Sequence, residues 1–181
     1  MDTYKLKFTR LQNEIIRLMC IKAGEKLNQR EIAKMLKVSP TAISKALPLI
    51  EKEGLIKIEK NKRMNLILAS LDGTNQKALH LKRAENLKML CESGLDSYLE
   101  EFFPGATIIL FGSYSRGDDT IKSDIDVAII GRKEKEINLN EYEKTLQRKI
   151  ILNFYPSFKE IHKHLKENIC NGLVLSGGIE L

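Results

Sequence analysis

Apolar residues in the first part of the chain recur at intervals of three and four positions, the spacing of one face of an α-helix. Gly24 ends the first of these runs. Asn28 stands three residues before Glu31 in a capping-box arrangement, and Ser39-Pro40 combines an N-cap with a first-turn proline, so each pair predicts a helix start. The pattern predicts three short helices joined by tight turns, over residues 10–23, 28–37 and 39–54.

The pattern changes after Gly54. Residues 55–60 and 64–68 are strand-like, and the segment between them, residues 61–63, is polar, as the tip of a β-hairpin requires. Three helices followed by a hairpin resemble the winged-helix DNA-binding domain of MarR-like and related regulators, over about residues 8–70. The segments that carry this resemblance are residues 29–33, 39–45 and 53–56.

The resemblance implies DNA contacts at two places. The outward, N-terminal side of the third helix would meet base edges or phosphates in the major groove through Thr41, Ser44 and Lys45. The hairpin tip would meet the DNA backbone or the minor groove through Lys60, Lys62 and Arg63. The implied partner is double-stranded DNA bound by a homodimer. The alternative is a winged helix that serves dimerisation or another protein contact.

The distribution of charge supports the first of these alternatives. The chain of 181 residues has a formal net charge of +6, but residues 1–73 hold 15 Lys and Arg against 8 Asp and Glu, a net charge of +7. Residues 74–181 hold 15 against 16, a net charge of −1. A basic excess confined to one part favours a polyanionic partner, although a solvated basic surface gives the same composition.

The second part of the chain alternates helical and strand-like segments. The helical pattern of residues 75–103 is broken near Ser93-Gly94, and the remaining pattern predicts strands over residues 107–111, 124–130, 150–155 and 173–175 and helices over 138–149 and 157–169. The predicted fold class is α+β. The predicted domains are a winged helix over residues 1–73, a helical linker over 74–94, and a domain with a small mixed sheet flanked by helices over 95–181.

A Gly-Ser turn and an Asp-x-Asp pair lie between apolar runs of this second part. Gly112-Ser113 follows a buried strand and leads into a short helical turn, whose free amides suit a phosphate. Asp124 and Asp126 are two apart on the next strand, so both carboxylates point to one face and can hold magnesium. Turn residues and a solvated strand end would produce the same motif without any ligand.

Together these elements resemble the DNA polymerase β-type nucleotidyltransferase superfamily, particularly its minimal members, over roughly residues 95–178. The resemblance implies that the chain binds a nucleoside triphosphate, with ATP as the first candidate, through Gly112, Ser113, Arg116 and Ser123. It also implies that Asp124 and Asp126 are the catalytic pair and coordinate Mg²⁺, as two ions in an active enzyme. The implied reaction is transfer of a nucleotidyl group, such as adenylyl, to a hydroxyl of a protein or small molecule; a partner toxin is one conceivable acceptor.

Members of this nucleotidyltransferase superfamily usually have a third carboxylate on the strand that follows the Asp-x-Asp strand. Asn153 is the nearest match to that position in the sequence, and an amide carries no charge and cannot act as a base. Glu160 and Glu180 are the acidic residues that follow it and could substitute. The sequence therefore leaves two functions open: a nucleotidyltransferase, or a transcription regulator whose inactive domain senses nucleotide or supports dimerisation.

The cysteines and the apolar runs indicate which covalent, metal and membrane features to expect. Cys20, Cys91 and Cys170 are far apart in helix-like contexts, so we expect core thiols and neither disulfides nor a zinc site. The N-terminus lacks the apolar core of a signal peptide, and no run approaches the roughly 18 apolar residues of a membrane span. The sequence predicts a cytoplasmic protein that contacts no membrane.

Overall fold

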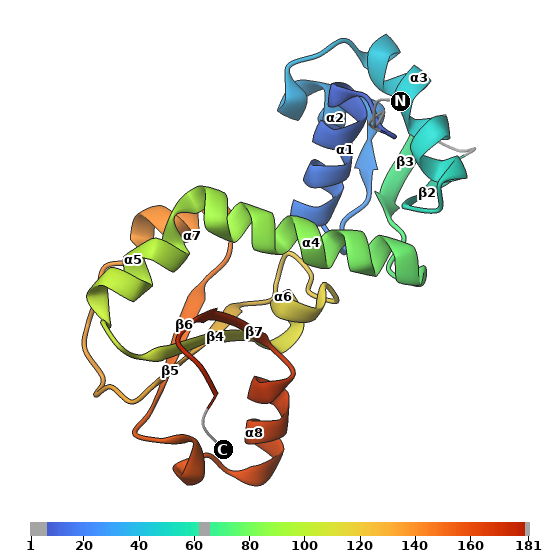
Figure 1. The fold of residues 1–181 in the computed structure, drawn as a ribbon. Helices are drawn as coiled ribbons and strands as arrows, with labels where there is room; N and C mark the ends of the chain where they lie inside the picture. Colours follow the sequence, from blue (N-terminus) through green and yellow to red (C-terminus); the bar gives the residue numbers. More distant parts are fainter. Residues whose placement is uncertain (1–6, 62–65, 180–181) are drawn as a thin grey trace, which may run out of the picture. The chain divides into compact units, whose positions relative to one another are not determined.

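The computed structural model describes residues 7–61 and 66–179. The chain divides into two compact units, with the boundary between Leu79 and His80. The division falls inside one helix, α4 (Gln76–Ser93) (Figure 1). The predicted boundary at residue 73 and the separate linker over 74–94 stay predictions.

The first unit begins with three helices. They are α1 (Arg10–Ile21), α2 (Gln29–Leu36) and α3 (Pro40–Lys52). Asn28 caps α2 through its side chain, which accepts hydrogen bonds from the backbone amides of Arg30 and Glu31, and the Glu31 carboxylate accepts one from the Asn28 amide in return. Ser39 caps α3 through its hydroxyl, which accepts a hydrogen bond from the Ala42 amide. The capping residues identified in the sequence therefore set the starts of both helices.

A three-stranded antiparallel sheet completes the first unit, in the order β1 (Leu27–Asn28), β3 (Leu66–Leu71), β2 (Ile56–Asn61). The two-residue strand β1 was not predicted, because it is too short to show an alternating pattern. Ile15, Ile32, Ile43 and Ile50 are fully buried between the helices and this sheet. Helices and hairpin form the predicted winged-helix arrangement.

The second unit is built on a four-stranded sheet in the order β6-β5-β4-β7. β5 and β6 are parallel and the other pairs are antiparallel. The elements after α4 are α5 (Leu95–Phe102), β4 (Thr107–Phe111), α6 (Gly112–Arg116), β5 (Ile125–Ile130), α7 (Asn140–Leu146), β6 (Ile150–Tyr155), the 3₁₀ turn η1 (Phe158–Glu160), α8 (Lys163–Cys170) and β7 (Leu173–Ser176). The predicted break at Gly94 is confirmed, and this residue has a φ of +78°.

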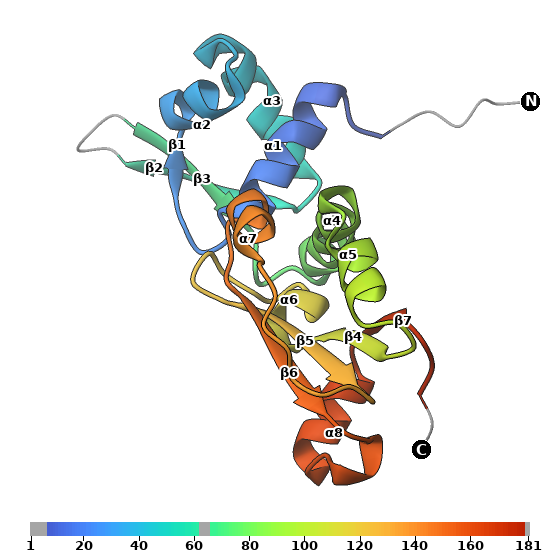
Figure 2. The same cartoon turned by 90° about the vertical axis from the view of Figure 1, so that its left-hand side faces the viewer.

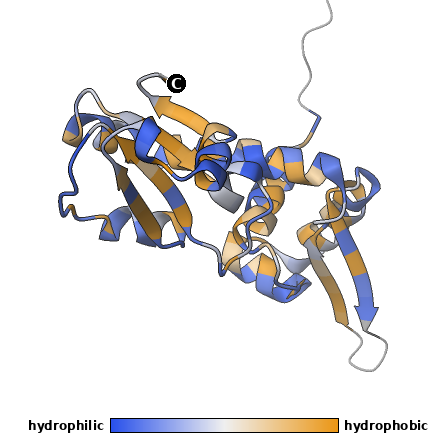
Figure 3. Ribbon diagram, turned by 90° about the horizontal axis from the view of Figure 1, so that it is seen from below, coloured by the Kyte–Doolittle hydropathy of each residue, from blue (hydrophilic) through white to orange (hydrophobic). Residues whose placement is uncertain are grey.

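Helices lie on both sides of this sheet. α8 lies on one side and α5 on the other (Figures 1 and 2). The core on the α8 side includes Ile109, Ala128 and Ile169, and the central strands are mostly hydrophobic (Figure 3). The fold class is α+β, as predicted.

Two further details differ from the sequence-based expectations. The helix predicted over residues 157–169 is divided into η1 and α8, and the division lets Phe158 and Ile161 join the core. Cys20 is buried as expected, but Cys91 and Cys170 are exposed and are not core thiols.

Within the described residues, none of the helices combines the length and the apolar character that crossing a bilayer demands.

Candidate functional site

Gly112 and Asp126 lie side by side at one end of the second sheet. Asp126 pairs with Phe111, the last residue of β4, so the first residue of α6 is next to its side chain. A Cβ added to Gly112 would lie 2.5 Å from Asp126 Oδ2, and Gly112 has a φ of +74°. Both the backbone conformation and the close carboxylate therefore require glycine here.

The charge of Asp124 acts on the carboxyl group of Asp126. Asp124 is exposed just before β5, whereas Asp126 is half-buried on the strand. Burial raises the pKa of Asp126 above its ordinary value, the charge of Asp124 raises it further, and the charge of Arg116 lowers it. The pair is thus a concentration of negative charge that would be stabilised by a cation.

The other predicted nucleotide-binding residues lie on α6 and on the loop before β5. Ser113 is partly exposed on α6. Arg116 is exposed on the same helix, and its guanidinium donates hydrogen bonds to Asp118 Oδ2 at 3.3 Å and Asn168 Oδ1 at 3.2 Å. Ser123 shapes its loop, because its Oγ accepts a hydrogen bond from the Thr120 amide at 3.0 Å. Arg116 is close enough to Asp126 to affect its pKa, and Ser123 directly precedes Asp124.

The register of β6 changes the interpretation of the third position. The parallel pairing places Ile151 opposite Asp126 and Asn153 opposite Ala128. Directly paired side chains share a face of the sheet, so the neighbour of Asp126 is Ile151, and Asn153 is two residues, or roughly 6.6 Å, farther along the strand. The expectation that Asn153 occupies the third position is wrong, because sequence spacing does not fix the register between strands.

The later acidic residues do not supply a third carboxylate within the described structure. Glu160 lies on η1, beyond Tyr155, which pairs with Ile130 at the other end of β5 from Asp126. Its Oε1 instead accepts a hydrogen bond from Ser157 Oγ at 3.2 Å. Glu180 lies outside the described residues.

The carboxylates of Asp124 and Asp126 supply only part of the ligands that a magnesium ion needs. The described residues contain no group of three or more His, Cys, Asp or Glu side chains placed to hold a metal. Mg²⁺ commonly uses one or two protein carboxylates and takes its other ligands from water and substrate phosphates. Asp124 and Asp126 therefore suit an ion brought in with a triphosphate better than a permanently bound metal.

A buried ionic cluster behind this site was missed by the sequence analysis. The carboxylate of Asp119 forms an ion pair with Lys82 Nζ and accepts a hydrogen bond from Asn86 Nδ2 at 2.7 Å. It also forms an ion pair with Arg148 Nη2 at 3.4 Å. Asn86 Nδ2 also donates to the backbone oxygen of Tyr114 at 2.9 Å. All five residues are at most 5% exposed. The cluster joins α4, α6, the loop leading to Asp124 and the start of β6.

A signal for this cluster does exist in the sequence. Ala78, Lys82, Asn86 and Leu90 recur every four residues and are all buried along α4. Polar residues within a helical buried stripe indicate an internal polar contact, because burying them unpaired is costly.

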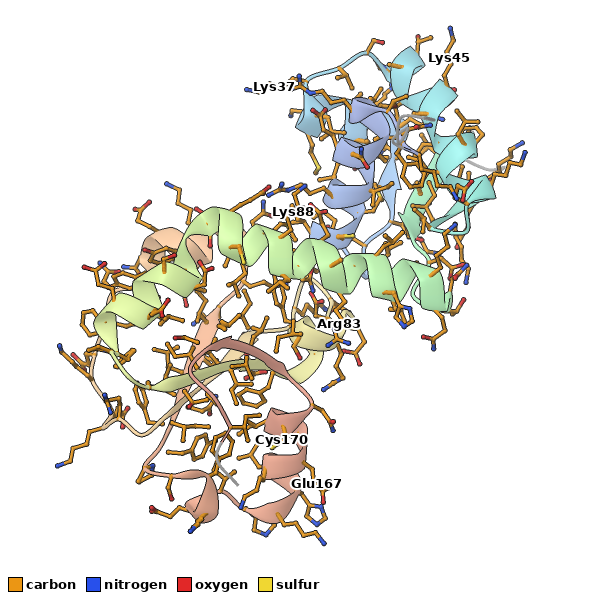
Figure 4. The ribbon with its side chains drawn as sticks, viewed as in Figure 1. Lys37, Lys45, Arg83, Lys88, Glu167 and Cys170 are labelled. Carbon is orange, nitrogen blue, oxygen red and sulfur yellow. The ribbon has the colours of Figure 1, made fainter. Side chains whose placement is uncertain are left out.

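The predicted DNA-contacting residues of α3 lie together on one exposed face. Thr41, Ser44 and Lys45 are exposed, whereas Ile43 and Leu47 are buried on the opposite face. Figure 4 shows Lys45 projecting outward from the helix. Lys60 is exposed on β2. Lys62 and Arg63 lie outside the described residues.

Comparison with known proteins gives separate results for the two parts of the chain. The family profile described as the nucleotidyltransferase domain matches residues 93–175. Over 136 residues, the chain is 29% identical to the phenylalanine–tRNA ligase alpha subunit of Pyrococcus abyssi, with 74% of this chain and 24% of that protein covered. The chain thus spans about a quarter of that relative.

Solved structures of transcription regulators show a partial likeness. ZitR from Lactococcus lactis, in one structure, is 24% identical, with a TM-score of 0.41, over 57% of this chain and 67% of that chain. Another ZitR structure, described as a zinc-responsive MarR family member, is 28% identical with a TM-score of 0.38, over 56% and 65%. The adhesin competence repressor of Streptococcus pyogenes is 19% identical with a TM-score of 0.41, over 54% and 69%.

Proposed function

Residues 93–175 of the chain are a nucleotidyltransferase domain, and from this premise we propose that the second unit binds a nucleoside triphosphate together with magnesium. The observation that carries the proposal is the contact between Gly112 and Asp126. It places a turn without a side chain directly beside a carboxylate of raised pKa. The Asp126 carboxylate fills the space beside Gly112, so a cation held by this acid would lie next to the turn and could bind a phosphate there.

Each residue of the site has a distinct task in this proposal. Gly112 and Ser113 hold the triphosphate, through the backbone amides at the start of α6 and a partly exposed hydroxyl. Arg116 balances phosphate charge, and its contacts with Asp118 and Asn168 hold it in place. Asp124 and Asp126 hold magnesium, which, when bound with the nucleotide, neutralises charge at the phosphates. ATP is the first candidate among the nucleotides.

We further propose that the first unit binds double-stranded DNA as part of a homodimer. The exposed face of α3 with Thr41, Ser44 and Lys45, together with the basic excess of residues 1–73, supports this partner. Contacts of this kind to phosphate would give affinity that falls with salt. The whole chain would then be a DNA-binding protein that carries a nucleotide site.

Two functions of the nucleotide site follow from different observations. The intact Gly-Ser turn and aspartate pair favour transfer of a nucleotidyl group, such as adenylyl, to a protein or small-molecule hydroxyl, including one on a partner toxin. Ile151 beside Asp126 favours the second candidate, a regulator that senses nucleotide without turnover, because an isoleucine provides neither a metal ligand nor a base.

One experiment separates these candidates. Purified protein is incubated with magnesium and each radiolabelled nucleoside triphosphate, alone and with cell lysate, and nucleotide binding is measured in parallel. Binding without label transfer identifies a sensor, whereas magnesium-dependent labelling of an acceptor identifies an enzyme. A wild-type protein that binds no nucleoside triphosphate would refute the proposed site, and Asp126→Ala is the variant expected to lose binding.

DNA binding has its own test. Gel-shift titrations at several salt concentrations should show affinity falling with salt, and Lys45→Ala should lower both the affinity and the salt dependence, the latter by about one unit of the log–log slope. The exposed Lys163 on α8 supplies a control, since Lys163→Ala removes the same charge from the other unit. If Lys45→Ala leaves binding unchanged, the winged helix serves a protein contact.

A further inference from the structure

A polar cavity of about 460 Å³ opens beside Asp124, on the side formed by α7 and the start of β6. Ile121 is the one apolar residue among those that line it. Three exposed lysines contribute to the lining: Lys122, Lys144 and Lys149. The cavity is shallow and open to solvent, and its volume can accommodate a ligand of about nucleotide size. Its polar lining favours a charged ligand over an apolar one.

The charges around this cavity are unbalanced. Within the described part of the chain, none of the three lysine ammonium groups forms an ion pair with an acidic side chain. Two carboxylates, those of Asp124 and Glu143, also line the cavity. Glu143 is engaged, because its Oε1 accepts a hydrogen bond from the Ile150 amide at 3.0 Å. An anion would relieve the repulsion among the three lysines.

The walls of the cavity are held by hydrogen bonds that do not involve these lysine side chains. The Ile125 amide donates to the backbone oxygen of Lys149 at 2.8 Å, which joins the starts of β5 and β6. Arg148, which also lines the cavity, donates to the backbone oxygen of Gln147 at 3.0 Å and contacts Asp119. The lysine side chains are therefore attached to a fixed frame and are available to a ligand.

We propose that this cavity binds a second, phosphate-bearing ligand next to the nucleoside triphosphate, with Lys144 and Lys149 as its main contacts. The ligand is either the end of a single-stranded nucleic acid or a nucleoside monophosphate, since both present phosphate beside a hydroxyl. In an enzyme this molecule would be the acceptor. A cationic acceptor is disfavoured by the three lysines. The assignment of the triphosphate to Gly112 and Ser113 rests on the proposed function, but phosphate binding in the cavity, which Ser123 also lines, does not.

The test uses the full chain with the nucleotide site filled by magnesium and a non-hydrolysable ATP analogue. Binding of AMP and of a five-nucleotide single strand with a free 3′-hydroxyl is measured by calorimetry and fluorescence anisotropy. Lys144→Ala combined with Lys149→Ala should weaken binding of at least one probe about tenfold while affinity for the analogue changes by less than about twofold. The probe that responds identifies the source of the phosphate.

Two control variants test whether the loss of binding is specific to this cavity. Lys163→Ala combined with Lys166→Ala removes the same charge from α8 and should leave both probes unaffected. Lys45→Ala shows whether the oligonucleotide binds through the first unit instead. Circular dichroism of each variant confirms that it is folded.

Two kinds of outcome overturn the inference, and a third concerns the nucleotide site alone. If the double variant loses the ATP analogue as strongly as the probes, the cavity belongs to the triphosphate. If neither probe binds the wild type, or if binding ignores Lys144 and Lys149, the cavity has no phosphate ligand. If the wild type fails to bind the analogue, the proposed nucleotide site fails, but the response of the probes to the two lysines still decides this inference by itself.

Discussion

The carboxylate of Asp126 occupies the space that a side chain at Gly112 would fill, with a hypothetical Cβ 2.5 Å from Asp126 Oδ2. Gly112 directly follows β4 and Asp126 lies on β5, and antiparallel pairing of these two strands brings the residues together. The shape of the turn and the position of the acid are therefore one structural feature, and changing either residue should affect both.

Gly112→Ala should weaken binding of the magnesium–nucleotide complex about tenfold or more, because a methyl group here displaces the Asp126 carboxylate and removes a charge-assisted contact. The left-handed φ of +74° should also cost about 1–2 kcal/mol of folding free energy. Nucleotide titration and denaturant unfolding measure the two effects.

Gly94→Ala is the matched control for this change. Gly94 has a similar φ of +78°, but a Cβ there meets no atom within 4 Å. It should cost comparable stability and leave nucleotide binding intact. Equal loss of binding in both variants would show that the effect is one of general stability.

Asp126→Asn should make the magnesium-free protein more stable at neutral pH. The folded-state pKa of Asp126 lies above its ordinary 3.8, mainly through burial, so ionisation of this group opposes folding. The penalty develops as the pH rises above 3.8 and is complete above the raised pKa, and it is absent at lower pH. Thermal melts across this range in EDTA should show the melting temperature of the variant increasing relative to that of the wild type as the pH rises.

Magnesium and nucleotide should reverse this order. They should stabilise the wild type and leave the Asn variant unaffected, because the same carboxylate that weakens the empty fold holds the cation. A variant that is less stable than the wild type at neutral pH in EDTA would contradict the assigned cause of the pKa shift.

Ile151→Asp should strengthen magnesium binding and, if the site transfers nucleotidyl groups, raise turnover roughly 10²-fold through a general base. Ile151 is directly paired with Asp126 and is 40% exposed, so a carboxylate there reaches water and the metal site. Magnesium titration and the label-transfer assay measure the two gains.

Asn153→Asp provides the comparison for this prediction. Asn153 is paired with Ala128, so its carboxylate would stand away from Asp126 and should leave both measurements unchanged. A gain with Asn153→Asp and none with Ile151→Asp would show that the strand register differs from the one described.

Asp119→Ala should destabilise the protein by about 3–5 kcal/mol, because it leaves the buried side chains of Lys82 and Arg148 without this carboxylate. Its neighbour Asp118 is exposed and pairs with Arg116 at 3.3 Å, so Asp118→Ala should cost at most about 1 kcal/mol. Chemical unfolding of the two variants measures the difference. Similar losses would show that the buried cluster contributes little.

Local patterns predicted most of the elements. The capping residues Asn28 and Ser39 and the break at Gly94 are decided by nearest neighbours, so their effects can be identified from a single sequence. The Gly-Ser turn and the two aspartates could also be predicted, because each is a short motif next to an apolar strand.

Contacts between distant segments could not be predicted in this way. The sequence by itself determined the α+β class, the winged-helix order and the aspartate pair, since these depend on periodicity and on spacing within one element. Only the tertiary structure decided that Ile151 adjoins Asp126, that Asp119 is buried with Lys82 and Arg148, and that lysines line the cavity beside Asp124. These contacts depend on strand register and helix packing, which arise when the whole chain buries its core.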